Sequence, residues 1–139
     1  MRYMGLDLGS RTCGVSISDE TALVASTLKT IRFTPDDYDE CLDAVLELVK
    51  EHKPDGIVLG LPRHMNGDIG ERGQISQEFG EVLEEESGVK VTMWDERLTT
   101  VAAEKILISA NVSRKKRKTV IDQMAAVQIL QSYLDSLRR

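Results

Sequence analysis

Three acidic residues occupy positions where a carboxylate is unusual, and their types could support shared chemistry. Asp7 falls inside an apolar run at residues 3–8 that is typical of a β-strand, although aspartate is depleted in strands. Glu96 comes just after a second apolar run, at residues 89–94. Asp122 falls in the middle of the apolar stripe of the last helix that periodicity predicts. A carboxylate in such places needs a compensating partner.

These three acids together predict a site for a divalent metal ion. Carboxylates gathered within about 4 Å repel one another by roughly 4 kcal/mol per pair at an effective dielectric near 20, so a cluster needs protons or a cation. Ligation by oxygen alone selects Mg²⁺ or Mn²⁺. Such an ion can activate water and stabilise the leaving oxygen in phosphodiester hydrolysis. We therefore expect Asp7, Glu96 and Asp122 to be both catalytic residues and metal ligands of a nuclease.

Local explanations for the same acids stay open at this point. Backbone N–H groups of the turn at residues 9–12 could cap Asp7, and Asp122 is close enough to the start of its helix to act as a cap. Asp95 and Glu96 cannot be told apart by alternation, because neighbouring residues of a strand point to opposite faces. The sequence pattern alone therefore leaves the second ligand open between them.

The elements that position these acids follow from hydrophobic periodicity. Runs at residues 3–8, 13–18 and 23–31 with short connections predict an antiparallel meander. The period then changes to that of a helix, capped by Thr34 and ending before Pro54. The continuous apolar run at residues 55–62 predicts a parallel strand buried on both faces, typical of a βαβ step.

The second half of the chain continues the alternation of helices and strands. An amphipathic helix ends at Gly88, and the fifth strand at residues 89–94 follows it. A helix is expected at about residues 101–110, and the last helix runs from Thr119 to about Leu137. Its predicted buried stripe consists of Ala126, Ile129, Leu130, Tyr133 and Leu137.

A local patch would have to hold any polyanion, because the net charge of −5 argues against loose attachment to nucleic acid or anionic lipid. Five consecutive cations offer one: Arg114, Lys115, Lys116, Arg117 and Lys118. A solvated loop is the alternative for this run, which we do not expect to pack. Arg11 and Arg97 follow strands and would position the nucleic-acid backbone. Asn66 and Gly67 lie in a loop that is either a plain turn or a cradle of N–H groups for phosphate.

Composition bounds the remaining possibilities. At 139 residues the chain is expected to be a single domain, residues 1–139, and no apolar run approaches the roughly 20 residues of a membrane span. No signal-peptide pattern precedes the first strand, so a cytoplasmic location is the expectation. Cys13 and Cys41 form no metal-binding motif and are interpreted as reduced, buried small residues.

At several motifs the chain resembles the YqgF (RuvX) group of bacterial proteins in the RNase H-like superfamily, which is related to Holliday junction resolvases. The motifs follow the family's order over nearly the whole chain. They are Gly5-Leu6-Asp7-Leu8-Gly9-Ser10-Arg11 with Gly14-Val15, Gly60-Leu61-Pro62 with Asn66 and Gly67, Asp95-Glu96-Arg97-Leu98-Thr99-Thr100, and Asp122 with Ala125-Ala126 and Ile129-Leu130-Gln131.

The resemblance implies an α/β, RNase H-like fold: a five-stranded mixed sheet, its first three strands antiparallel, with helices on both faces. It also implies a divalent-metal nuclease that matures the precursor of small-subunit ribosomal RNA, with acids at Asp7, Glu96 and Asp122. Two departures are Arg63-His64, where the family more often has uncharged residues, and Ala125, where the resolvases proper carry a fourth acid. Ala125 argues against a strict two-metal site, and His64 is expected to be an exposed loop residue.

Other functions stay open on the sequence. A DNA endonuclease like the Holliday junction resolvases rests on fold analogy, and a non-catalytic RNA-binding module of ribosome assembly would keep the fold without turnover. An actin-like or sugar-kinase-like ATPase also begins with Asp-x-Gly and a hairpin, but it needs two such domains. The sequence does not separate RNA from DNA, endonuclease from exonuclease, or monomer from dimer.

Overall fold

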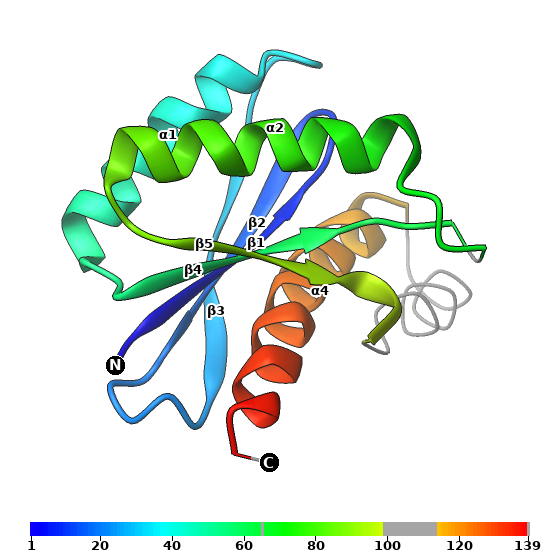
Figure 1. The fold of residues 1–139 in the computed structure, drawn as a ribbon. Helices are drawn as coiled ribbons and strands as arrows, with labels where there is room; N and C mark the ends of the chain where they lie inside the picture. Colours follow the sequence, from blue (N-terminus) through cyan, green and yellow to red (C-terminus); the bar gives the residue numbers. More distant parts are fainter. Residues whose placement is uncertain (65, 99–113, 139) are drawn as a thin grey trace.

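Five strands form one sheet in the order β3-β2-β1-β4-β5 (Figure 1). The computed structural model describes residues 1–64, 66–98 and 114–138, and for residues 114–123 it describes the backbone but not the side chains. The elements are β1 (Tyr3–Leu8), β2 (Thr12–Ser18), β3 (Ala25–Arg32), α1 (Tyr38–His52), β4 (Gly56–Leu61), α2 (Gly70–Ser87), β5 (Val91–Asp95), the 3₁₀ turn η1 (Glu96–Leu98) and α4 (Arg114–Ser136).

The sheet is mixed, as predicted. β1, β2 and β3 form the antiparallel meander, and a tight turn joins β1 to β2, in which the Gly9 N–H donates to the Thr12 carbonyl at 2.8 Å. β4 lies between β1 and β5 and pairs with both of them in parallel. All residues of β4 are buried, which explains its continuously apolar sequence.

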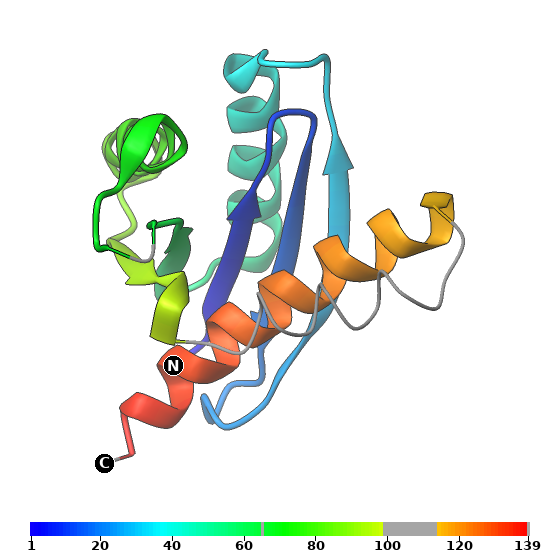
Figure 2. The ribbon, with the colours of Figure 1, turned by 90° about the vertical axis from the view of Figure 1, so that its right-hand side faces the viewer.

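Helices cover both faces of the sheet. Figure 2 shows α1 and α2 on one side and α4 crossing the other side. The larger core cluster lies under α1 and α2 and includes Leu6, Leu59 and Val45. A second cluster lies under α4 and includes Val58 and Ile129. The mixed sheet order and the helices on both faces confirm the predicted fold class.

Two small residues of the meander let α4 pack closely against the sheet. The buried Ser16 hydroxyl on β2 donates to the Ala126 carbonyl of α4 at 2.7 Å. On β1, a Cβ atom at Gly5 would lie 2.7 Å from the Leu130 Cβ and 3.1 Å from the Ala126 carbonyl oxygen, too close for a larger residue. Close contact at these points fixes the height and position of α4 over β1 and β2.

The predicted helix starts were wrong in two places. α1 begins at Tyr38 rather than near Thr34, because Asp36 has a left-handed φ of 63° and Asp37 is the cap, its carboxylate accepting from the Glu40 N–H at 3.2 Å. α4 begins at Arg114, so the basic run is helical and not a loop. Arginine and lysine are good helix formers, which the charge argument neglected.

The last helix ends at Ser136, close to the predicted end, but its buried stripe differs from the prediction. Leu137 follows the helix and is 50% exposed, whereas Leu134 is fully buried. The helix expected at 101–110 lies outside the described residues. Cys13 and Cys41 are buried and form no disulfide within the described residues, and His64 is exposed, as predicted. In the part of the chain that the structure describes, no helix is both long and apolar enough to cross a membrane.

Candidate active site and nucleic-acid interface

The strand β1 carries Asp7 to the face of the sheet that α4 covers. Asp7 is the last residue but one of β1, lies opposite Gly14 of β2, and is half-buried. Side chains of a strand alternate between faces, so Asp7 shares a face with Gly5, which contacts α4. The acid therefore stands at the carboxyl end of a central strand, on the α4 side.

Glu96 reaches the same face from β5. It follows Asp95, the last residue of that strand. A Cβ atom at Gly60 of β4 would lie 3.3 Å from the Glu96 Cγ and 2.5 Å from the Ile129 Cδ1 of α4. The side chain of Glu96 is therefore packed over Gly60, beneath α4.

Asp7 lies beside the place over Gly60 that the Glu96 side chain occupies. Leu6 of β1 is paired with Leu59 of β4 in the parallel ladder. Asp7 follows Leu6 as Gly60 follows Leu59, so Asp7 and Gly60 are the next neighbours along the two strands. Asp7 and Glu96 consequently approach the same place on one face of the sheet, from strands on either side of β4.

The third predicted acid is placed only by its backbone. Asp122 is in α4, one helical turn before Ala126, the residue whose carbonyl is held by Ser16. Its side chain lies outside the described residues. Among the side chains that the structure describes, no three His, Cys, Asp or Glu residues converge closely enough to hold a metal ion. The three-acid cluster therefore stays a prediction.

The described donors suit a hard cation. Asp7 and Glu96 are half-buried and offer oxygen ligands only, which Mg²⁺ and Mn²⁺ prefer. The missing Cβ of Gly60 leaves the space that the Glu96 side chain occupies. The residues present therefore fit the predicted kind of ion.

Asp95 has a different environment from Glu96. Alternation directs it to the face opposite Trp94, whose indole N–H donates to Ser132 of α4 at 3.2 Å. The Asp95 carboxylate accepts from Arg97 Nη2 at 2.8 Å and lies 3.3 Å from Arg63 Nε. The hydrogen bond from Arg97 lowers the pKa of Asp95, and the same contact raises the pKa of Arg97. This geometry favours Glu96 over Asp95 as the partner of Asp7.

The loop that follows β4 is closed on itself. The N–H of His64 donates to the Asp68 carbonyl at 2.7 Å, that of Gly67 to the His64 carbonyl at 2.9 Å, and that of Asp68 to Asn66 Oδ1 at 3.0 Å. Gly67 has a φ of 98°, which explains the glycine there. These three N–H groups already donate to acceptors within the loop and are not available to phosphate. For them the plain turn, and not the cradle of N–H groups, is the correct description.

The predicted cations fall in two places. Arg11 is exposed in the turn after β1, at the same end of the strand as Asp7, and Arg97 lies in η1 beside Glu96. The basic run, residues 114–118, forms the start of α4, and its side chains lie outside the described residues.

Some residues that support this edge were missed by sequence reasoning. Arg72 of α2 donates to the Tyr38 hydroxyl at 2.8 Å and to the Leu8 carbonyl at 3.2 Å, so it holds the end of β1 directly after Asp7. Ser16 and Arg63 also act through contacts with distant parts of the chain. Of these residues, only Arg63 could have been identified from the sequence, because it closely follows a predicted parallel strand, where ligand-binding residues are expected.

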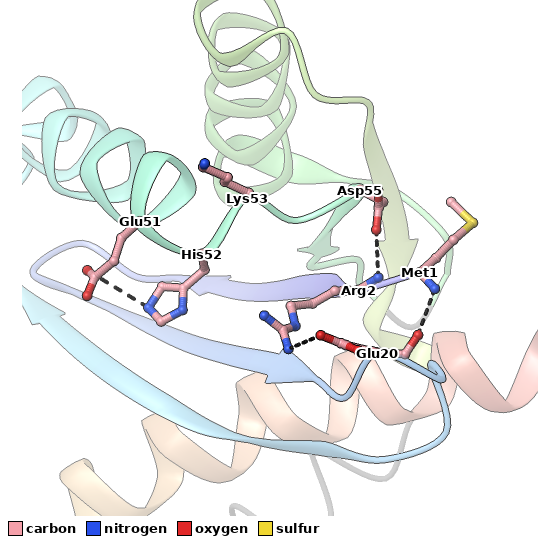
Figure 3. Close-up of a pocket in the computed structure, with 7 residues that line it drawn as sticks. All are labelled: Met1, Arg2, Glu20, Glu51, His52, Lys53 and Asp55. Carbon is pink, nitrogen blue, oxygen red and sulfur yellow. Dashed lines mark hydrogen bonds and ion pairs between the residues drawn. The ribbon is translucent and has the colours of Figure 1, made fainter.

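A polar pocket of about 660 Å³ lies at the opposite end of the strands (Figure 3). Several of its polar groups contact one another: Arg2 lies 3.5 Å from Glu20, the Met1 ammonium donates to the Glu20 carbonyl at 2.7 Å, and the Arg2 N–H donates to Asp55 at 2.8 Å. Ligands of open α/β sheets bind at the carboxyl ends of strands. The acidic pair, not this pocket, is therefore the candidate active site.

A mixed sheet of this order, covered on both faces and with acids at the carboxyl ends of β1 and β5, is the RNase H-like fold of the resolvases. The structure of "T. thermophilus RuvC in complex with Holliday junction substrate" has the same fold, with a TM-score of 0.68 at 15% identity over 99% of this chain and 96% of that one. The fowlpox virus Holliday junction resolvase has a TM-score of 0.58 at 16% identity over 99% of both chains.

The sequence identifies the family. Residues 1–136 match the family described as "RuvX: Holliday junction resolvase". Proteins named "Putative pre-16S rRNA nuclease" are 57% identical in Bacillus licheniformis and 56% identical in Bacillus subtilis, each over 137 residues and 99% of both chains. The chain belongs to the RuvX family of nucleases. This membership confirms the resemblance, and it argues against the alternative of an actin-like or sugar-kinase-like ATPase.

Proposed function

We propose that this protein is a metal-dependent nuclease that hydrolyses phosphodiester bonds in the precursor of 16S ribosomal RNA. The position of Asp7 and Glu96 on either side of Gly60, on one sheet face, is the observation that carries the proposal. The names of the relatives from the two Bacillus species support this RNA as the substrate. The proposal includes a single domain that acts in the cytoplasm.

Asp7, Glu96 and Asp122 would hold one Mg²⁺ or Mn²⁺ ion. When bound, this ion would lower the pKa of a water and stabilise charge on the leaving oxygen. The chain itself fixes the geometry: β1 holds Asp7, the absence of a side chain at Gly60 gives Glu96 its place, and Ser16 seats the helix that carries Asp122.

The charge distribution indicates from which side RNA approaches. Helices α1 and α2 together carry eleven acidic residues against Lys50 and Arg72. A phosphate backbone is repelled by this layer. Helix α4, whose first residues are basic, lies on the other face of the sheet (Figure 2), and Arg11 and Arg97 lie at the carboxyl ends of the strands. RNA is therefore expected to bind across this edge and the α4 side of the sheet.

The basic residues have distinct roles in the proposal. Arg11 and Arg97 flank the acidic pair and would contact phosphates near the scissile bond. Residues 114–118 would contact the backbone farther away. Cations in the first turns of a helix oppose its dipole, and a bound phosphate would offset that cost. Asn66 and Gly67 lie in the loop after β4, and their contact with nucleic acid stays a prediction.

The Asp7→Asn variant tests the proposal. Wild-type protein should shorten a transcript of the 16S rRNA precursor in Mg²⁺ or Mn²⁺ and leave it intact in EDTA. The Asp7→Asn variant should cleave at a rate reduced by about a hundredfold or more, because the substitution removes a charged ligand. Its melting temperature should not fall. Asp43→Asn, an exposed acid of α1, is the matched control and should cleave normally.

The same assay separates the alternatives. Full activity of Asp7→Asn would contradict the proposed role of the acids. Cleavage of a four-way DNA junction without cleavage of the transcript would support the DNA endonuclease. Binding of the transcript without cleavage in either metal would support the non-catalytic module.

A further inference from the structure

We propose that Arg63, Arg97 and Asp95 form a phosphate-binding subsite beside the acidic pair, with Asp95 as the residue that positions the two arginines. The ligand is a backbone phosphate of the nucleic acid, so this inference rests on the proposed function. Arg63 had no binding role in the sequence prediction, and Asp95 entered it only as the alternative to Glu96 for the second metal ligand. The subsite gives both a function.

Asp95 holds Arg97 firmly. Its carboxylate accepts from Arg97 Nη2 at 2.8 Å, from Arg97 Nε at 3.2 Å, and from the backbone N–H of Arg97 at 2.9 Å. Asp95 is the last residue of β5, so the anchor belongs to the sheet. With 19% of its side chain exposed, Asp95 is covered more than either arginine.

Arg63 is fixed from two directions. Its Nε lies 3.3 Å from Asp95 Oδ2, and its Nη1 donates to the Gly67 carbonyl at 2.9 Å. The positive φ of Gly67 lets the loop turn back to provide that carbonyl. The loop after β4 is thereby joined to the end of β5, and the two guanidinium groups share one carboxylate.

The arrangement leaves both charge and donors available. Two guanidinium groups face one carboxylate, so the cluster keeps a net positive charge. Within the described part of the chain, Arg97 Nη1 and Arg63 Nη2 make no hydrogen bond, and the side chains of Arg97 and Arg63 are 40% and 31% exposed. Arginine has five N–H donors in a planar fork and binds phosphate oxygens in pairs.

The position of the cluster suits a polynucleotide. Leu61 of β4 is paired with Asp95 of β5, so the arginines lie at the carboxyl edge of these neighbouring strands. Glu96, the next residue, turns to the α4 face over Gly60. A strand that crosses this edge would place one phosphate near the acidic pair and another near the arginines.

A simple surface ion-pair network is the competing explanation, and it predicts the opposite effect at one position. Exposed ion pairs contribute about 0–1 kcal/mol to stability. If Asp95 were only a negative charge near the nucleic acid, Asp95→Asn would strengthen binding by reducing repulsion. If Asp95 positions Arg63 and Arg97, Asp95→Asn weakens binding although it makes the protein less acidic.

The experiment measures binding of a fluorescein-labelled RNA hairpin with single-stranded flanks by fluorescence anisotropy, in EDTA and at several salt concentrations. Arg63→Gln and Arg97→Gln should each raise Kd by about tenfold. Each should also reduce the slope of log K against log salt by about 0.7 to 0.9. Asp95→Asn should raise Kd, and Arg63→Gln combined with Asp95→Asn should show less than the sum of the two effects.

Arg138→Gln is the matched control, because Arg138 pairs with Asp135 at the far end of α4. It should leave Kd and the salt slope unchanged. An unchanged Kd and slope in Arg63→Gln, or tighter binding by Asp95→Asn, would overturn the subsite.

Failure of the proposed function gives a different result. Wild type would then bind the hairpin with the predicted dependence on Arg63 and Arg97 but cleave nothing in Mg²⁺ or Mn²⁺. Wild type that does not bind the hairpin at all would overturn both proposals.

Discussion

The hydroxyl of Ser16 donates to the carbonyl of Ala126 at 2.7 Å, joining buried atoms that are 110 residues apart in the sequence. This contact ties the middle of β2 to α4 one helical turn after Asp122. This hydrogen bond therefore connects the sheet side of the candidate site to the helix side close to Asp122, whereas the bonds from Ala25 to Gln131 and from Trp94 to Ser132 hold α4 farther along. Loss of that bond should affect the position of α4 before it affects the sheet.

Ser16→Ala should lower the free energy of unfolding by about 1 kcal/mol, the usual value of one buried hydrogen bond. Cleavage should fall by more than stability, because the turn that carries Asp122 loses its anchor. Chemical denaturation and cleavage of the precursor transcript measure the two effects. Ser26→Ala removes a hydroxyl that is exposed and lies 3.5 Å from its carbonyl partner, Ile17, and should change neither. Equal effects of the two substitutions would argue against an anchoring role.

Gly60→Ala should be damaging at a position where nothing reacts. The new Cβ would lie 2.5 Å from the Ile129 Cδ1 and 3.3 Å from the Glu96 Cγ. Overpacking of this kind costs about 1–3 kcal/mol, and Glu96 would be displaced. Gly80→Ala is the control for overpacking away from the site, since its Cβ would lie 3.0 Å from Met93 Sδ, 3.2 Å from Leu59 Cδ2 and 3.4 Å from Val91 Cγ1. Normal cleavage by Gly60→Ala would mean that the place of Glu96 does not matter.

The order of the elements was predictable because each has a local signal. The period of two in β1, β2 and β3, the continuous apolar run of β4, and the glycine that ends α2 all depend on residues close in sequence. The helix starts were less predictable. Asp37 rather than Thr34 caps α1 because Asp36 adopts a left-handed conformation, and several nearby polar residues could have served equally well.

The acids and Arg97 had a signal in the sequence as site candidates, whereas the contacts that join Arg63, Asp95 and Arg97 did not. Asp7 was conspicuous because a strand excludes carboxylates. The choice between Asp95 and Glu96 needed the register that sets Gly60 opposite Trp94, which no local pattern reveals. The pair of Arg63 with Asp95 joins residues from two different strand ends. Such contacts depend on tertiary structure, and the hydrophobic periodicity of the sequence does not indicate them.

Glu96→Gln should strongly slow cleavage while the RNA still binds. The amide keeps the shape of the side chain but removes a charged ligand, so turnover should fall about a hundredfold or more. Activity that remains should require a higher Mn²⁺ concentration than wild type. A metal titration of cleavage, with RNA binding measured in EDTA, separates the two steps. A wild-type Mn²⁺ requirement and rate in Glu96→Gln would reassign the second ligand.

Stability should depend on pH through Asp19, in the turn after β2. Its carboxylate is hydrogen-bonded by the Thr21 hydroxyl and by the N–H groups of Val24 and Leu23, which lower its pKa from 3.8 to about 2. A lowered acid pKa stabilises the folded state above 3.8, and this contribution disappears as the pH falls toward 2.

The Asp19→Asn variant isolates this effect, because the amide oxygen can still accept from the backbone but carries no charge. Wild type should melt at a higher temperature than Asp19→Asn near neutral pH, and the two melting temperatures should converge as the pH approaches 2. A difference that stays constant over this range would show that the charge of Asp19 does not stabilise the turn.

The basic start of α4 should bind the nucleic-acid backbone without reading its sequence. Because residues 114–118 are helical, glutamine is a better replacement than serine: it removes the charge and keeps a strong helix former. Replacing all five cations should weaken binding of RNA and flatten its salt dependence by about 0.7 to 0.9 for each lost phosphate contact. Circular dichroism checks that the helix is intact. An unchanged salt slope would mean that this turn faces solvent in the complex, and that the arginines at the strand ends supply the phosphate contacts by themselves.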